Sequence, residues 1–227
     1  MDQQSIDARY ATPTRHTSVV PQDRALTEWL LRAFAILTFG VFIYNATRVW
    51  WSDPSRVTLL LLVLTESFTV CLVLFARRAL IRDLSPLAVG ATVYAVLFFA
   101  LLRYGDTNQL APEWFGATLQ MVGLAWQVLS KATLGRAFGL LPASRGLVTS
   151  GPYRVVRHPI YLGYLIAHVG FLLTNFSWWN VLILASLYAA QVVRMQREET
   201  MLGEGEHSTA YEAYRAQVKY RLIPRVY

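Results

Sequence analysis

The sequence has a single cysteine, only two lysines and few charged residues of either sign. Because Cys71 is alone, a disulfide framework and a cysteine-based metal site are both excluded. Charged residues make up 15% of the 227 residues, whereas a soluble domain usually has about 25%. Hydrophobic residues reach 55%, in long runs such as 58–76, where Glu66 is the only ionisable residue besides Cys71. Since roughly 20 apolar residues span a bilayer, the composition excludes an ordinary soluble enzyme and a disordered chain.

Three common catalytic patterns are also missing. No glycine-rich phosphate loop follows a strand pattern and strands do not alternate with helices, which excludes a soluble dinucleotide-binding or methyltransferase domain of the Rossmann type. No set of His, Asp and Glu residues has the spacing of metal ligands, so we expect no metal. No Ser–His–Asp nucleophile can be argued either.

The apolar runs predict an all-α fold, a polytopic integral membrane helix bundle of about six transmembrane spans. The expected spans are 26–49, 57–76, 86–102, 114–131, 159–174 and 178–193. Only the short segment Asn175–Trp179 connects spans five and six, so these two are expected to form a helical hairpin. No internal repeat is found, which argues against an inverted-repeat transporter.

Arginines indicate the orientation of these spans. The formal net charge is +7, and the basic residues cluster in short segments between apolar runs instead of covering one soluble face. This is the positive-inside pattern, so we expect a bilayer as partner and no nucleic acid. Arg77, Arg78 and Arg82 follow span two, and further basic segments follow spans four and six. Both termini are then cytoplasmic, and the excess of Arg over Lys suggests a bacterial inner membrane.

The chain is expected to have three parts. Residues 1–24 are polar and of mixed charge and are interpreted as a cytoplasmic tail. Residues 25–132 form a four-span membrane region. Residues 133–227 hold a loop, the last two spans and a cytoplasmic amphipathic helix at 209–218, capped by Ser208. That helix is expected to lie on the membrane surface or to cover a pocket.

A few polar residues lie inside the expected spans. Glu66 is near the middle of span two, where an unpaired carboxylate costs several kcal/mol, so it is either part of a site or hydrogen-bonded inside the bundle. Gln120 and Gln127 share one helix face and are expected to form interhelical hydrogen bonds. In span five, Gly163, Ala167 and Gly170 form a stripe of small residues that lets a neighbouring helix approach closely.

Another stripe of span five is polar. Tyr161, Tyr164 and His168 follow i, i+3, i+7 spacing and therefore share one face, which we expect to border a cavity or the cytoplasmic mouth. His168 is otherwise a structural histidine whose hydrogen bonds are satisfied. Its role is left open by the sequence.

The segment 135–159 before span five is rich in glycine, proline and arginine, and reads GRAFGLLPASRGLVTSGPYRVVRHP. Since aromatic and apolar residues interleave with these, we interpret it as an ordered loop that forms a site. Pro159 suits the first turn of span five, and His158 lies at its mouth, where free N–H groups attract anions. Glu198 and Glu199 lie near the end of an extended last helix, where carboxylates oppose the helix dipole. They either capture a cationic group or form solvated pairs such as Arg194–Glu198.

Together these pieces resemble the isoprenylcysteine carboxyl methyltransferase family, which is grouped with the phospholipid N-methyltransferases. The matching runs are GPYRVVRHPIYLG at 151–163, REE at 197–199 and YEAYRAQVKYRLIP at 211–224, with LGRAFGLLP before them. The resemblance covers about residues 134–225, and the first four spans carry no matching motif. It implies that S-adenosylmethionine binds at the cytoplasmic face and that its methyl group is transferred in line to a lipophilic acceptor from the bilayer.

The resemblance also implies residue roles. The cofactor-binding residues would be Tyr153, Arg157, His158, Pro159, Tyr161, Gly163, Glu198 and Glu199. A glutamate would pair with a positive group, Arg157 or the helix start would hold the carboxylate, and the tyrosines would stack on adenine or face the sulfonium. Glu198 and Arg221 would act in catalysis, Arg221 by orienting an anionic acceptor. The acceptor is left open as a prenyl-thioether carboxylate, a lipid headgroup amine or a thiol.

Two other functions are compatible with the sequence. The Pro-Tyr-Gly helix start and the late Tyr, Arg and Ile-Pro pattern also resemble membrane steroid and sterol reductases that use NADPH, although a 2′-phosphate would favour arginines over Glu198 and Glu199. A non-catalytic membrane scaffold or transport subunit is the second alternative. The ordered cytoplasmic motifs argue against it.

Overall fold

The computed structural model describes residues 22–75, 86–134, 147–204 and 208–227. This part of the chain is all-α, with seven α-helices and one 3-10 helix. The elements are α2 (Gln22–Ser52), α3 (Val57–Phe75), α4 (Pro86–Leu101), α5 (Glu113–Leu134), η2 (Gly151–Arg154), α6 (Pro159–Thr174), α7 (Trp178–Glu204) and α8 (Ser208–Gln217). Residues 1–33 and 34–227 are separate compact units, and the features below belong to the second.

The helices match the predicted spans within a few residues. The apolar runs thus predict where each helix lies, and α7 continues to Glu204 as its polar end indicated. In the four described stretches, no helix combines the length and the hydropathy needed to cross a membrane. The arginines between spans two and three (77, 78 and 82), most of the predicted N-terminal tail and residues 135–146 of the predicted site-forming loop lie outside the described residues.

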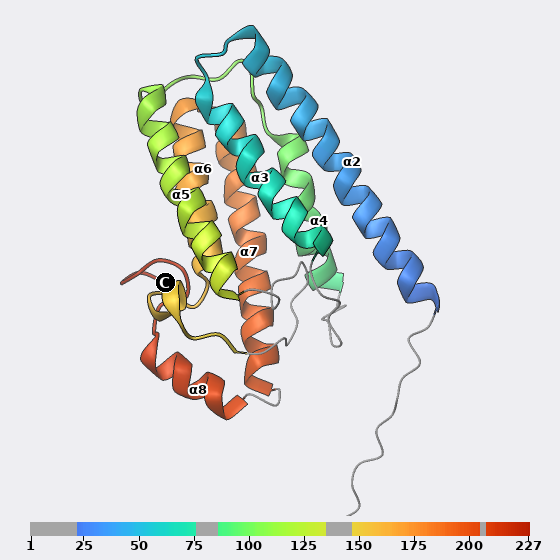
Figure 1. Cartoon of the computed structure of the whole chain (residues 1–227), viewed down its shortest axis with the longest axis vertical. Coiled ribbons are helices and arrows are strands. Elements are labelled where there is room, and N and C mark those ends of the chain that lie inside the picture. The colour runs from blue at the N-terminus through green and yellow to red at the C-terminus, as the bar shows by residue number, and fades with distance from the viewer. Residues whose placement is uncertain (1–21, 76–85, 135–146, 205–207) are drawn as a thin grey trace, which may run out of the picture. The chain divides into compact units, whose positions relative to one another are not determined.

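Helices α5 and α6 run antiparallel with their backbones in close contact (Figure 1). A Cβ atom on Gly123 would lie 2.6 Å from the carbonyl oxygen of Gly163, and one on Gly170 would lie 2.5 Å from the carbonyl oxygen of Gly116. The small-residue stripe of α6 therefore faces α5, as a stripe that admits a neighbour should.

The predicted hairpin of spans five and six is formed by α6 and α7, but it is not the main helix pair. Helices α6 and α7 do follow one another across a short turn, but α6 packs mainly against α5, and α7 packs mainly against α4. The reason is steric complementarity: glycines on α5 meet glycines on α6 and let the two backbones approach closely, whereas α6 and α7 meet through larger side chains such as His168 and Tyr188.

Polar side chains hold the turn between α6 and α7 to the neighbouring loops. Asn180 accepts a hydrogen bond from the backbone N–H of Arg103 at 2.9 Å and donates one to its carbonyl oxygen at 2.9 Å. Asn175 accepts a hydrogen bond from the Arg56 guanidinium. Both asparagines are fully buried. These bonds join the start of α3 and the end of α4 to the turn between α6 and α7.

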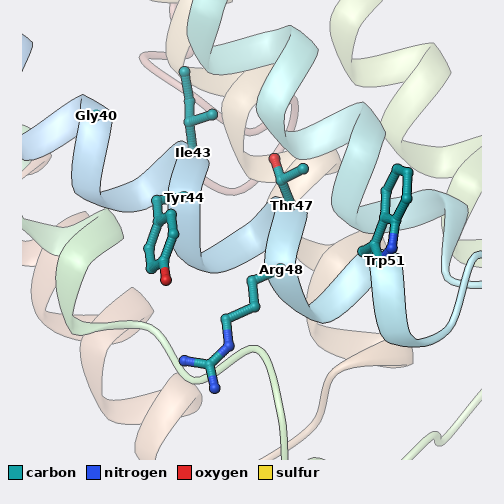
Figure 2. A pocket seen from close by; sticks show the side chains of 6 residues that line it. All are labelled: Gly40, Ile43, Tyr44, Thr47, Arg48 and Trp51. Atoms are coloured by element: carbon teal, nitrogen blue, oxygen red, sulfur yellow. The ribbon is translucent and has the colours of Figure 1, made fainter.

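Helix α2 carries an open apolar pocket on its surface, shown in Figure 2. Its lining residues are Gly40, Ile43, Tyr44, Thr47, Arg48 and Trp51. None of the site residues predicted from the sequence lines this pocket. It is therefore separate from the candidate active site described next.

Candidate active site

The C-terminal segment runs beside the start of α6. The backbone N–H groups of Arg157 and His158 each donate to a carbonyl oxygen at 2.9 Å, on Tyr220 and Arg221 respectively. Helix α8 is attached to the 3-10 helix η2 because the hydroxyl of Tyr214 donates to the carbonyl oxygen of Tyr153 at 2.8 Å. Segments some 60 residues apart in sequence thus form one structure around the mouth of α6.

Three basic side chains converge on Glu199 at the centre of this structure. Its Oε1 atom accepts from Nε of Arg157 at 2.9 Å and from Nε2 of His158 at 3.1 Å, and its Oε2 atom accepts from Nε of Arg221 at 3.0 Å. We call these four residues the Glu199 cluster. The Glu199 side chain is 8% exposed. Both carboxylate oxygens are therefore occupied by groups of the protein.

The same guanidinium of Arg157 also anchors the C-terminal segment. Its Nη1 atom donates to the carbonyl oxygens of Val218 at 3.1 Å and Lys219 at 3.0 Å. Arg221 in turn donates from Nη1 to the hydroxyl of Tyr227 at 2.9 Å. Arg157 thus holds the segment that directly follows α8, and is not free to bind a ligand carboxylate by itself.

The Glu199 cluster should make the fold sensitive to acid. Burial opposes ionisation of Glu199, but His158 and Arg157 outweigh it and lower its pKa from 4.5 to about 2. Because the folded-state pKa is the lower one, ionised Glu199 stabilises the fold above pH 4.5, and this contribution is lost as the pH falls towards 2. We expect the stability difference between wild type and Glu199→Gln, measured by denaturant unfolding in detergent, to shrink between pH 4.5 and 2.

The matched control is Glu212→Gln on α8. Glu212 is 61% exposed and pairs only with Arg215 at 3.5 Å, so its removal should leave the pH dependence unchanged. A constant difference between wild type and Glu199→Gln over the acidic range would contradict the lowered pKa.

Glu198 lies on a different side of α7, next to two aromatic rings. Burial, and then the charge of Glu198, raise the pKa of Tyr153 above its usual value, and the same charge acts on Tyr161. The guanidinium of Arg194 lies 5.8 Å from the centre of the Tyr161 ring. Glu198 is partly exposed and makes no hydrogen bond or ion pair with any residue of the described stretches. Unlike Glu199, it is a carboxylate still available to a ligand.

The remaining predicted site residues lie at the start of α6. Pro159 occupies its first turn and is buried, and His158 is the residue before the helix, as the sequence indicated. The rings of His158 and Tyr161 lie 5.8 Å apart. Gly163 instead faces α5, where a Cβ atom would lie 2.5 Å from Cγ of Gln127. Its position is explained by helix packing.

Sequence reasoning did not select Tyr211 as a site residue. The side chain is 2% exposed, and its hydroxyl has no hydrogen-bond partner among the described residues. Burial and the charge of Glu199 raise its pKa, so the hydroxyl keeps its proton at neutral pH. The sequence placed Tyr211 in the aromatic stripe of α8. It did not show that the hydroxyl is buried near Glu199 without a hydrogen-bond partner, because this depends on how α8 folds back.

This arrangement defines a helical site in which a carboxylate and aromatic rings lie beside a buried ionic cluster. Residues 111–205 match the family described as phospholipid methyltransferase, so this part of the chain is a phospholipid methyltransferase family domain. The family implies a methyltransferase that acts on lipids and uses S-adenosylmethionine. The matched region contains the start of α6 and both glutamates, whereas α8 and Arg221 lie beyond it. No curated protein matches the chain in sequence.

The residues present fit S-adenosylmethionine. Among the described residues Glu198 is an unpaired carboxylate, which suits the ammonium or sulfonium charge of this cofactor, and Tyr153 and Tyr161 are aromatic rings of the kind that attract cations. The orphaned hydroxyl of Tyr211 is a buried donor for a polar atom of a ligand.

Proposed function

We propose that the chain is an integral membrane methyltransferase that transfers a methyl group from S-adenosylmethionine to a lipophilic acceptor. The observation that carries this proposal is the contrast between the two neighbouring glutamates. Both oxygens of Glu199 are hydrogen-bonded to basic side chains of the protein, whereas Glu198 is unpaired among the described residues and lies beside two tyrosines. An anionic, aromatic site suits a sulfonium cation, and it disfavours the phosphates of NADPH.

The Glu199 cluster has a positioning role in this proposal. It fixes the mouth of α6 and the C-terminal segment on either side of Glu198, so that the site is preorganised. His158 and Arg157 bind Glu199 directly, which makes their contribution to cofactor affinity indirect. Bound S-adenosylmethionine would supply an electrophilic methyl group, and in-line transfer of that group depends mostly on positioning and on exclusion of water.

Arg221 is the residue we propose for orienting an anionic part of the acceptor. Its Nε atom is held by Glu199, but its side chain is 26% exposed, unlike Arg157 at 7%. The acceptor class includes an isoprenylcysteine-like carboxylate, a lipid headgroup amine and a thiol.

We further propose that the helices lie in a bilayer with both chain ends on the cytoplasmic side, where the site opens. Large apolar side chains stand exposed along several helices and would be covered by lipid tails: Leu37, Leu64, Val122, Leu129 and Leu182. Trp51, Trp114 and Trp178 are more than two-thirds exposed at the opposite end of the bundle from the site, as expected of an interfacial aromatic belt.

Binding of S-adenosylhomocysteine to the detergent-purified full chain tests the cofactor. Calorimetry should show saturable binding of S-adenosylhomocysteine and none of NADPH. Glu198→Gln should weaken binding about 10–100-fold, the value of a hydrogen bond to a charged group. Glu212→Gln removes the same charge from an exposed position and should leave the affinity unchanged.

Each other outcome points to a different function. Binding of NADPH alone would support a membrane reductase. Binding of neither molecule would support a non-catalytic membrane protein. Unchanged affinity in Glu198→Gln would remove Glu198 from the site.

A further inference from the structure

A second group of buried polar residues lies in the middle of the bundle, away from the Glu199 cluster. Oε1 of Glu66 on α3 lies 3.8 Å from Nε2 of His168 on α6, and both side chains are 3% exposed. The other ring nitrogen of His168, Nδ1, is hydrogen-bonded to the hydroxyl of Tyr188 on α7 at 2.9 Å. Three helices thus contribute a carboxylate, an imidazole and a phenol, and the imidazole contacts both of the other groups.

Several polar atoms in this region have no hydrogen-bond partner among the described residues. Oε1 of Glu66, Nε2 of His168 and both polar atoms of Gln120 make no hydrogen bond with the described residues. The side-chain oxygen of Gln127 accepts a hydrogen bond from Lys131 of its own helix at 3.1 Å, so neither glutamine forms the expected interhelical hydrogen bond with a described residue. Buried polar groups with a purely structural role are normally satisfied. In Glu66 and His168 the orphaned atoms also face each other at 3.8 Å, which sets this pair apart from a single unsatisfied group.

Glu66, Gln120 and His168 all lie within about 12 Å of one shared level of the bundle, measured along their helices. Their helices meet at the other end of the bundle, where Thr174 donates to Thr58 at 3.1 Å and a Cβ on Gly116 would contact both residues. From that level each of the three positions is four to eight residues along its helix, or roughly 6–12 Å at 1.5 Å per residue. We call these three residues the polar layer.

Aromatic side chains connect this layer to the candidate active site. On α6, the rings of Tyr164 and His168 are stacked with their centres 6.1 Å apart, and the hydroxyl of Tyr164 lies 3.2 Å from Nζ of Lys131. Tyr161, on the same stripe, is beside Glu198. The charge of Glu66 acts on Lys131 of α5, on Tyr188 of α7 and on Tyr104 in the α4–α5 loop. These are the titratable groups that surround Glu66 and His168.

We propose that Glu66, His168 and Tyr188 form a proton-accepting site that serves methylation of a protic acceptor, whose nucleophile is an amine, a hydroxyl or a thiol. The inference rests on the proposed methyltransferase function and extends it. Glu66 lies outside the matched residues 111–205. The site is built from side chains that the methyl transfer to a carboxylate would not need.

The proton balance of the reaction explains the need for such a site. The heteroatom of the acceptor bonds to the methyl carbon with its own electron pair, and the electrons of the broken carbon–sulfur bond stay on the leaving thioether. The proton of the heteroatom passes to Nε2 of His168, the ring nitrogen that has no hydrogen-bond partner among the described residues. The carboxylate of Glu66 stabilises the resulting imidazolium until the proton returns to water. Within a bilayer, bulk water cannot take up that proton directly.

The first test needs neither cofactor nor acceptor. Infrared difference spectra of the detergent-purified protein between acidic and basic pH should contain a carboxyl signal that is absent in Glu66→Gln. In Tyr188→Phe, which removes only the hydroxyl bonded to His168, the same signal should titrate at a different pH. Identical spectra for wild type and Glu66→Gln would overturn the proposal.

The second test compares protic and carboxylate acceptors. Transfer of labelled methyl groups is measured to phosphatidylethanolamine in mixed micelles, to dodecanethiol and to N-acetyl-S-farnesylcysteine. We expect transfer to a protic acceptor, with kcat about 100-fold lower in Glu66→Gln and in His168→Gln, the scale of acid–base catalysis. The acidic limb of the pH–rate profile should also change position, whereas structural damage would lower the rate equally at every pH.

Affinity for S-adenosylhomocysteine separates this proposal from the proposed function. It should be unchanged in all three variants, because the polar layer does not hold the cofactor. The matched control is Thr92→Val on α4. It removes another buried hydroxyl that has no hydrogen-bond partner among the described residues, and it should retain the wild-type rate. The proposed proton-accepting site is wrong if the cofactor binds but only the carboxylate acceptor, N-acetyl-S-farnesylcysteine, is methylated. It is also wrong if methyl transfer to a protic acceptor keeps its rate and pH profile in the variants. Failure of wild type to bind S-adenosylhomocysteine would reject the methyltransferase function as well.

Discussion

Replacing Glu199 by alanine is expected to abolish binding of S-adenosylhomocysteine and to destabilise the protein by about 3–5 kcal/mol, the usual cost of removing one partner of a buried ion pair. The variant leaves Arg157, His158 and Arg221 close together with no counter-charge. Their repulsion acts at the point where the C-terminal segment meets the mouth of α6. The geometry around Glu198 would therefore be lost together with the stability.

Calorimetry and thermal unfolding of the same preparation separate the two effects. Glu199→Gln keeps the size and one acceptor oxygen of the side chain, so it should lie between wild type and alanine in both measurements. Glu204→Ala, at an exposed position on the same helix, should change the stability by no more than about 0.5 kcal/mol. Wild-type affinity in Glu199→Ala would show that the Glu199 cluster does not organise a cofactor site.

The helices could be predicted from the sequence because each apolar run is bounded by charged or helix-breaking residues. The partner of the small-residue stripe of α6 was not predicted, because only that one stripe was considered. The relevant signal was nevertheless present: Gly116 and Gly123 are seven residues apart, as are Gly163 and Gly170. Two such stripes at equal spacing predict that two helices meet face to face.

The candidate site could be predicted only in part. The sequence around Pro159 predicts that His158 and Pro159 lie at the start of a helix. The family resemblance implies that the two glutamates belong to the cofactor site. The difference between Glu198 and Glu199 could not be derived, because it depends on where Arg157 and Arg221 arrive after the chain has folded back. The proximity of Glu66 and His168 likewise had no signal in the sequence, since the two residues come from helices that are about 100 positions apart.

Gly163→Ala is the second substitution for which we expect a large effect, and it distinguishes two explanations of this glycine. The added Cβ would lie 2.5 Å from Cγ of Gln127 and 2.8 Å from the carbonyl oxygen of Gly123. Gln127 is fully buried and the second contact is backbone, so α5 and α6 would have to separate. We expect a loss of about 3 kcal/mol, at the upper end of the usual cost of overpacking, measured by thermal unfolding in detergent.

The control for this substitution is Gly90→Ala on α4, where an added Cβ would have no atom within 4 Å. It should stabilise the protein by about 0.5–1 kcal/mol, because alanine is the better helix former. The affinity for S-adenosylhomocysteine then decides the role of Gly163. A less stable variant that binds normally while folded assigns the glycine to helix packing. Weakened binding at unchanged stability would instead support the cofactor role that the family resemblance implies, and would mean that α5 and α6 are not held together at this point.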